Sequence, residues 1–209
     1  MADSLVFYTN PMSRGQIVRW MLEETGVAYE TKVLDYAEAM KAPAYLAINP
    51  MGKVPAIAHN GQVITECAAI CAYLADAFPD AGLAPPAHER AAYYRWLFFG
   101  AGPVEQAVTN KAMGFGPSEQ QSRMAGYGSY DLTVDVLEKA VTAQPYVAGA
   151  DFSAADVYIG SQIGWGMEFG TLPKRAAFEH YWAKLSARPA YLRAKAIDNA
   201  LIAGAPVAA

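Results

Sequence analysis

The sequence is short of charge, of cysteine and of long apolar runs, and each shortage excludes a class of protein. Charged residues are 17% of the 209 residues, and the net charge of −4 comes from 16 Lys and Arg against 20 Asp and Glu. Because no long basic run occurs, nucleic acid is not an expected partner. No stretch reaches the about 18 apolar residues of a membrane span, and the N-terminus lacks the charged start of a signal peptide. We expect a cytoplasmic protein without membrane contact.

The two cysteines, Cys67 and Cys71, exclude further chemistry. They lie four residues apart in a predicted helix, where they share a face but do not suit a disulfide. The sequence has no Cys-x-x-Cys pair and no Cys/His ligand set, so we predict neither a metal site nor dithiol redox chemistry. Unpaired thiols fit a reducing compartment.

What is present is a hydrophobic fraction of 54%, enough for a proper core in one or two domains. The run Leu5–Tyr8 predicts a buried strand. Helical spacing of apolar residues predicts a helix over Arg14–Thr25, which Gly26 terminates. A loose alternation over Tyr29–Leu34 predicts a second strand, parallel to the first because it closes a right-handed βαβ unit.

The stretch from Asn49 to Phe78 predicts a hairpin followed by a helix. Pro55 opens the first strand, and the Val54–Pro55 bond is a candidate for the cis form. Asn60-Gly61 between two apolar runs predicts the turn. The helix is expected over 67–78, with Thr65 as its N-cap.

Pro79–Pro86 is rich in Pro, Gly and Ala and indicates a linker. We therefore divide the chain into a domain over 1–79, a linker over 80–87 and an all-helical domain over 88–209. In the second domain Gly100–Pro103 predicts a helix break, and Ser153 with Asp156 predicts a capping box that starts a buried helix.

The hairpin and the helix after it also suggest a binding site. A helix N-terminus favours a carboxylate, Glu66 favours an ammonium group, and the outward backbone of Val54 favours a peptide bond. Together they suit a small zwitterion that contains a peptide bond. The alternative is a helix cap beside an ordinary hairpin.

These residues, NPMGKVPAI, the hairpin and the acidic residue that opens the next helix, resemble the glutathione S-transferase superfamily. The capping box after Tyr146-Val-Ala-Gly resembles the same superfamily, so the likeness spans both domains. It implies an α/β thioredoxin-like domain with a mixed four-stranded sheet, followed by an all-α domain. It also implies glutathione as co-substrate, no metal, and a homodimer.

The resemblance further implies which residues hold glutathione. Val54 and Pro55 would meet the cysteinyl backbone, while Glu66 and Cys67 would hold the γ-glutamyl end. The superfamily usually has Ser where this chain has Cys67, so a hydroxyl donor is missing there. Lys53, or more weakly Lys41, would pair with the glycine carboxylate, unless these lysines only extend into solvent.

Four residues near the first strand's end qualify as the group that activates the glutathione thiol: Tyr8, Asn10, Ser13 and Arg14. We favour Ser13, because serine-type transferases carry their activating hydroxyl near this position; its other role is to cap the helix. Tyr8 and Asn10 remain alternatives, as a phenol and an amide donor, although Tyr8 also suits the core and Asn10 the turn. Arg14 would add positive charge or lie in solvent.

An electrophile pocket is expected to draw on aromatic residues of the helical domain, namely Tyr94, Phe98, Phe115 and Trp165, each of which also suits the core. The predicted function is conjugation of the glutathione thiolate to a small hydrophobic electrophile in detoxification, with peroxide reduction as a possible extra activity. Cysteine-type members need a cysteine that this chain lacks at the active position. Two alternatives stay open: a non-catalytic ligand-binding or interaction protein, and a glutathione-dependent disulfide reductase or isomerase.

Overall fold

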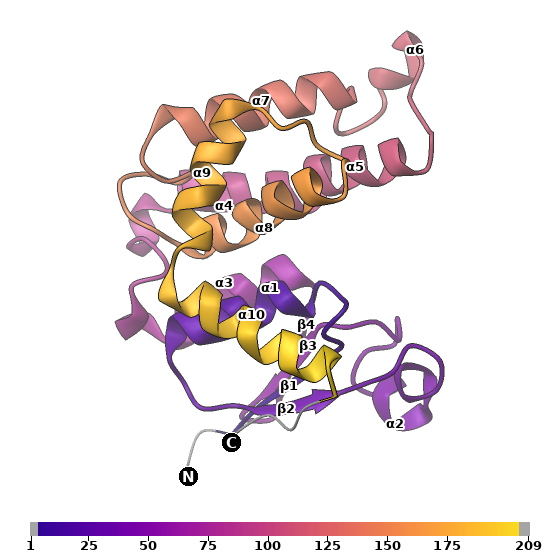
Figure 1. Cartoon of the computed structure of the whole chain (residues 1–209), viewed down its shortest axis with the longest axis vertical. Coiled ribbons are helices and arrows are strands. Elements are labelled where there is room, and N and C mark those ends of the chain that lie inside the picture. Colours follow the sequence, from indigo (N-terminus) through magenta and orange to yellow (C-terminus); the bar gives the residue numbers. More distant parts are fainter. Residues whose placement is uncertain (1–3, 205–209) are drawn as a thin grey trace. The chain divides into compact units, whose positions relative to one another are not determined.

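A four-stranded mixed sheet lies at the centre of the first of two units into which the chain divides (Figure 1). The computed structural model describes residues 4–204. The first unit comprises residues up to Ala81 together with those from Arg188 on, and the second comprises Gly82–Ala187. The strands are β1 (Leu5–Thr9), β2 (Glu30–Val33), β3 (Ala56–His59) and β4 (Gln62–Thr65). Their order across the sheet is β2-β1-β3-β4.

The pairing of the strands confirms the predicted topology. β1 and β2 are parallel, as a βαβ unit requires, while β3 is antiparallel to both β1 and β4. Asn60 and Gly61 both have positive φ, 50° and 82°, in the tight turn that joins β3 to β4. The Val54–Pro55 peptide is cis, as anticipated.

The two faces of the sheet are covered differently. Leu5, Phe7 and Thr9 of β1 are buried on the face that carries α1 (Gly15–Thr25) and α3 (Cys67–Ala77). Tyr8 points to the other face, where it packs with Tyr45 of the short helix α2 (Pro43–Leu46). A single turn of 3₁₀-helix, η1 (Ala39–Lys41), precedes α2, and Pro43 opens α2 as predicted.

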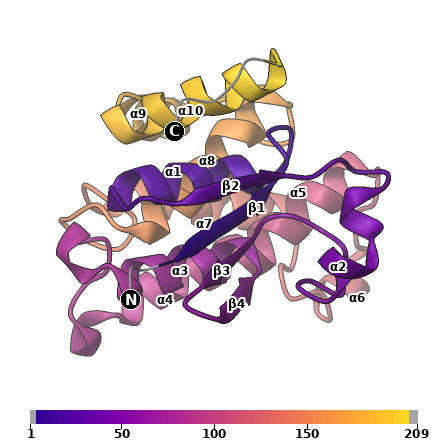
Figure 2. The same cartoon turned by 90° about the horizontal axis from the view of Figure 1, so that it is seen from below.

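The last helix, α10 (Pro189–Ile202), belongs to the first unit and lies along α1 (Figures 1 and 2). Its contacts with α1 include an ion pair between Arg19 and Asp198 at 2.7 Å, with both side chains 1% exposed. Arg188 also forms two hydrogen bonds with Glu24, at 2.6 and 2.8 Å. The contacts thus divide the chain differently from the sequence, which assigned this helix to the all-helical domain.

The second unit is a bundle of helices. It contains η3 (Ala87–Glu89), α4 (Ala91–Phe99), α5 (Glu105–Ala112), α6 (Glu119–Ser122), α7 (Tyr130–Ala143), α8 (Ala154–Glu168) and α9 (Ala176–Ser186). The 3₁₀ turn η2 (Pro79–Ala81) lies just before it in the predicted linker. The buried helix α8 starts at the predicted capping box, where Asp156 accepts hydrogen bonds from the N–H and hydroxyl of Ser153, both at 2.9 Å. No helix within residues 4–204 is both long enough and apolar enough to cross a membrane.

The predicted break at Gly100–Pro103 is wrong. A π-helical turn, η4 (Gly100–Val104), joins α4 to α5 without interruption. Pro103 lies inside this turn, where the regular α-helical hydrogen-bond pattern that a proline would break is already interrupted. Gly100 is required at the start of this turn, since a Cβ there would lie 2.9 Å from side-chain atoms of Tyr158 and Ile159.

Candidate functional site

Three segments meet at one end of the sheet, because each adjoins one of three residues that pair side by side across β1, β3 and β4. Tyr8 of β1 pairs with Ala56 of β3, and Ala56 pairs with Thr65 of β4. The turn after β1, the cis-proline before β3 and the start of α3 after β4 therefore begin from adjacent positions. The Cys67 thiol also lies 3.8 Å from the Arg14 carbonyl oxygen, so the first turns of α3 and α1 are neighbours. Register thus brings together the segments that carry Ser13, Val54 and Glu66.

The turn between β1 and α1 has every carbonyl from residue 10 to residue 14 hydrogen-bonded within the protein. The Asn10 carbonyl accepts from the N–H and hydroxyl of Ser13, at 3.0 and 2.7 Å. The Pro11 and Met12 carbonyls accept from the side chains of Gln16 (2.6 Å) and Tyr36 (3.2 Å). The Ser13 and Arg14 carbonyls accept from backbone N–H groups of α1. Oxygen lone pairs that would repel an anion are therefore engaged.

Arg14, not Ser13, is the N-cap of α1, and Ser13 lies one residue before it, in a position suited to anion binding. Its hydroxyl oxygen accepts the Gly15 N–H at 2.9 Å, and its proton goes to the Asn10 carbonyl. That carbonyl keeps the Ser13 N–H as a donor when the hydroxyl turns away. Rotation toward a bound thiolate would therefore cost little, because the carbonyl would not be left unsatisfied.

The Asn10 side chain is used for the turn. Its amide nitrogen donates to the Leu34 carbonyl at 2.9 Å, and its oxygen accepts the Met12 N–H at 2.9 Å. Both ends of the amide thus form hydrogen bonds with backbone groups. Stabilising the turn is the role that we gave as the alternative to thiol activation for Asn10.

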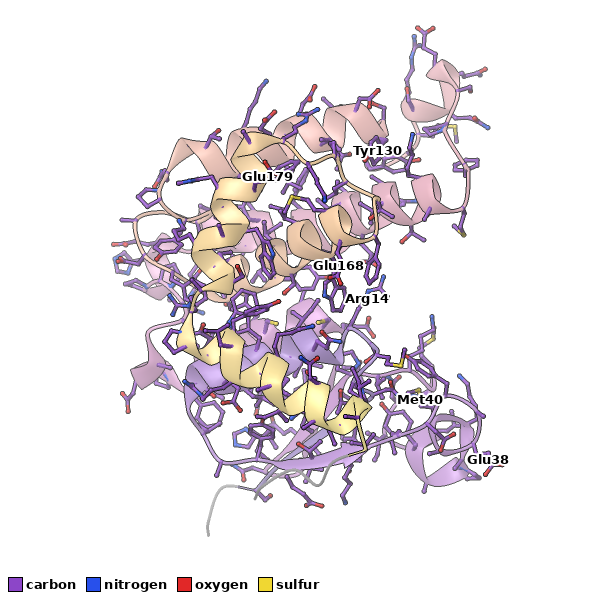
Figure 3. The ribbon with its side chains drawn as sticks, viewed as in Figure 1. Arg14, Glu38, Met40, Tyr130, Glu168 and Glu179 are labelled. Carbon is purple, nitrogen blue, oxygen red and sulfur yellow. The ribbon has the colours of Figure 1, made fainter. Side chains whose placement is uncertain are left out.

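Tyr8 and Arg14 differ in their surroundings. The Tyr8 ring lies 5.6 Å from the Tyr45 ring and packs on the same small cluster as Val54. Arg14 is exposed at the start of α1, and Figure 3 labels it there, together with Met40 and Glu38 in the segment before α2. Tyr8 therefore lies on the side of the cis-proline, while Arg14 lies on the side of α3.

The loop before the cis-proline is held by two residues that the sequence did not single out. The Lys53 carbonyl accepts from the Tyr45 hydroxyl at 2.7 Å and from the amide of the buried Asn49 at 2.8 Å. Burial raises the pKa of Tyr45 to about 12, so the hydroxyl stays a donor. Neither the N–H nor the carbonyl of Val54 has a hydrogen-bond partner within the part of the chain that the structure describes. The loop is thus held in place while the N–H and the carbonyl of Val54 stay available to a ligand.

The two lysines of this region are distinguished by their contacts. Lys41 donates to the Gly52 carbonyl at 2.8 Å, which ties η1 to the loop. The Lys53 side chain is exposed beside Val54. Lys53 is therefore the better placed of the two for a carboxylate.

The start of α3 corrects one prediction. Glu66, not Thr65, is the N-cap, because Thr65 still pairs in β4. Glu66 has φ 65° and ψ 116°, a conformation that non-glycine residues seldom adopt. It is exposed, whereas Cys67 behind it is buried. A strained residue at a helix start often marks a binding site.

The aromatic candidates of the second unit are surface residues to different degrees. Tyr94 and Phe98 lie one helical turn apart on α4 and are 44% and 74% exposed, while Trp96 and Leu97 between them are buried. Phe115, in the segment after α5, is 52% exposed, and Trp165 of α8 is half-buried. Tyr94 and Phe98 thus form the outward face of their helix rather than its core.

Sequence reasoning missed Tyr45, Asn49 and Gln16. Asn49 precedes a proline, and Asn-Pro is a turn signal, so the sequence could have indicated that Asn49 stabilises a loop. Nothing in the sequence distinguishes Gln16 from any other polar residue of a helix. Within residues 4–204 no three His, Cys, Asp or Glu side chains are grouped to hold a metal ion.

Comparison with known proteins gives a consistent result. The family described as "Glutathione S-transferase, N-terminal domain" matches residues 12–77. Glutathione S-transferase F9 of Arabidopsis thaliana is 29% identical over 189 residues, which is 81% of this chain and 86% of the plant protein. A glutathione transferase structure from Methylococcus capsulatus superposes with a TM-score of 0.76 at 28% identity, covering 93% of this chain and 98% of the other. A sphingomonad glutathione S-transferase complexed with glutathione gives a TM-score of 0.75 at 28% identity, with the same coverage.

Proposed function

The chain belongs to the glutathione S-transferase superfamily, and from this we propose that it binds glutathione at the end of its sheet and transfers the thiolate to a hydrophobic electrophile. The observation that carries the proposal is the row Tyr8–Ala56–Thr65, from which the three ligand-binding segments begin. An extended tripeptide with two carboxylates and one ammonium group matches what these segments offer.

Each part of glutathione has a counterpart in the first unit. The N–H and the carbonyl of Val54 pair with the cysteinyl backbone in the antiparallel manner of a strand edge. The first N–H groups of α3, from Cys67 on, receive the γ-glutamyl carboxylate, and Glu66 takes the ammonium group. Lys53 pairs with the glycine carboxylate. Cys67 contributes its backbone N–H in this scheme and not its buried thiol.

The thiol is activated by the turn between β1 and α1. A donor that favours the charged form lowers a thiol pKa. Ser13 supplies this donor after its hydroxyl turns from the Asn10 carbonyl, and Arg14 adds positive charge near it. Holding thiolate and electrophile together then accelerates the reaction without a covalent enzyme intermediate.

We assign the electrophile to exposed aromatic residues of the second unit, with Tyr94 and Phe98 as the first candidates. They lie four residues apart on the exposed side of α4. We further propose a homodimer and a cytoplasmic location, the latter because both cysteines are unpaired.

Calorimetric titration with glutathione tests the proposal. Wild-type protein should bind, and Glu66→Ala should weaken binding about tenfold, the worth of one charge-assisted hydrogen bond. Glu30→Ala, an exposed glutamate on β2 of the same unit, is the control and should leave the affinity unchanged. Absence of binding at millimolar glutathione would sink the proposal.

A non-catalytic member of the superfamily is the second candidate, and the engaged hydroxyl of Ser13 favours it. Turnover of a chlorodinitrobenzene with glutathione separates the two. Binding without turnover, and with an unshifted glutathione thiol pKa, would favour a carrier or an interaction protein.

A further inference from the structure

A chain of side-chain hydrogen bonds runs from α10 to the turn that carries Ser13. The Lys195 ammonium donates to the Gln16 side-chain oxygen at 3.3 Å. The Gln16 amide nitrogen in turn donates to the Pro11 carbonyl at 2.6 Å. The backbone N–H of Gln16 also donates to the Ser13 carbonyl at 3.2 Å. Gln16 therefore holds the turn at two points, one of them through its side chain.

Lys195 is one step of a regular series of contacts between α10 and α1. Arg188 bonds Glu24, the Tyr191 ring lies 5.1 Å from the Trp20 ring, and Lys195 bonds Gln16. The α1 positions descend by four residues each time, while the α10 positions rise by three and then four, so the two helices run antiparallel with facing stripes. The series ends at the first turn of α1. The ammonium of Lys195 is thereby fixed in place and not simply exposed on a free surface.

The hydrogen bonds from Lys195 through Gln16 end at the Pro11 carbonyl. The other carbonyls from residue 10 to residue 14 are held by donors of the turn itself, of α1's backbone, or of Tyr36. At Pro11 the donor is a side chain whose orientation depends on a second side chain. A carbonyl released at this point is free to turn its negative end toward a neighbouring anion, which raises the energy of a thiolate there.

We propose that Gln16 and Lys195 are positioning residues for thiol activation: they hold the Pro11 carbonyl within the protein and keep the Ser13 turn in the form that stabilises a thiolate. This inference rests on the proposed function. It assigns α10 a role in the chemistry of the first unit that goes beyond covering α1.

Several charged residues lie near the hydrogen bonds that join Lys195, Gln16 and Pro11. Asp198 lies one turn after Lys195 on α10, and burial raises its pKa, while Arg19 and Lys195 act in the opposite direction. Arg19 of α1 pairs with Asp198, and Arg193 of α10 pairs with Glu23 of α1. Arg14 stands at the start of α1. Because Asp198 already has Arg19 as a close partner, Lys195 remains available to Gln16.

The test measures the thiol pKa of bound glutathione by ultraviolet titration of the thiolate, together with affinity and thermal stability. Gln16→Met keeps the length of the side chain but removes both hydrogen bonds. It should raise the bound-thiol pKa and lower the turnover rate about tenfold at a pH below that pKa. Lys195→Met should give a smaller loss, about threefold, because this charge is partly exposed. Lys139→Met, on the exposed face of α7, is the control and should change neither quantity.

A double variant that moves the positive charge from position 195 to position 16 tests whether thiol activation can be restored. Gln16→Lys combined with Lys195→Met places a donor next to the Pro11 carbonyl without its present support, and should restore much of the thiol pKa shift. A purely structural role would lower the melting temperature in Gln16→Met and Lys195→Met but leave the bound-thiol pKa unchanged, which would overturn the inference. If wild-type protein neither binds glutathione nor lowers its thiol pKa, the proposed function fails and the inference fails with it. If wild type does both and the variants match it, only the inference fails.

Discussion

Gly15 permits the close approach of β1 and α1 on which the candidate site depends, and Gly15→Ala should destabilise the protein. A Cβ at this position would lie 1.9 Å from the Thr9 hydroxyl oxygen, 3.1 Å from the Thr9 Cβ and 3.0 Å from the Ser13 hydroxyl oxygen. Since real Cβ contacts essentially never fall below 3.0 Å, the first distance must grow by at least 1.1 Å. Thr9 is fully buried, so it has little room to move.

Two opposing effects set the magnitude. Replacing glycine by alanine in a helix gains up to about 1 kcal/mol. Forcing an extra methyl group into a packed site costs about 1–3 kcal/mol, and more where backbone must move. The overlap at Thr9 is severe, so we expect a net loss of about 2 kcal/mol. For a chain of this length that corresponds to a fall of about 4–8 °C in melting temperature.

Scanning calorimetry of three variants tests this reasoning. Gly15→Ala should melt below wild type, and adding Thr9→Ala should recover part of the loss, because it removes the atom at 1.9 Å. The matched control is Gly102→Ala, whose new Cβ meets nothing within 4 Å and which should not melt below wild type. The close-contact argument is refuted if Gly15→Ala is as stable as the control, or if the effects of the Thr9 and Gly15 changes simply add.

Three further predictions concern other features. Glu66→Gly should be about 1 kcal/mol more stable than Glu66→Ala in denaturant unfolding, because only glycine relieves the positive φ, while both weaken glutathione binding; equal stabilities would contradict the strain. Asp156→Ala should cost about 3 kcal/mol or more, since the buried carboxylate accepts from the Val147 N–H, from both donors of Ser153 and from the Tyr181 hydroxyl; a loss below about 1 kcal/mol would argue against this network. Burial is the largest effect on the Tyr29 hydroxyl and raises its pKa to about 12. The folded state therefore keeps the hydroxyl proton at pH values above 10.0, the ordinary pKa of tyrosine. Stability should therefore fall as the pH rises between these two values, and the fall should be shallower in Tyr29→Phe; identical slopes would refute the assignment.

Much of the fold could be predicted because local signals and the final structure agree. Gly26 ends α1 in the left-handed conformation, Asn60-Gly61 turns the hairpin, and Ser153 with Asp156 starts α8. Each depends on residues close in sequence, where backbone preference and side-chain chemistry are readable. The helix break predicted at Gly100 and Pro103 was wrong for the opposite reason: their usual effect is to end a helix, but here both lie in a π turn, where Gly100 packs closely on Tyr158 and Ile159, residues distant in sequence.

The sequence pattern predicts members of the candidate site but not their contacts, and their roles in binding stay predictions. Val54, Glu66 and Ser13 are identified by the pattern around them, yet only the register shows that they leave one row of the sheet. The sequence does not show which face of the sheet Tyr8 occupies. Alternation along a strand only places Phe7 and Tyr8 on opposite faces, without saying which face each one takes. Gln16 and Lys195 lie 179 residues apart, and no local signal joins them. Which residue activates the thiol stays a prediction.

The membership of α10 in the first unit has a consequence for how the protein is made. The sheet and α1 come before the second unit in the sequence, but the helix that covers α1 comes after the whole of it. A ribosome therefore releases Asp198, the buried partner of Arg19, only after it has made the whole of the second unit. Until then the face of α1 with Arg19 and Trp20 is uncovered, and the first unit waits for the second to be translated before it can close. The order of synthesis and the order of packing are thus different in this chain, because α1 gains its covering helix only after the second unit has been made.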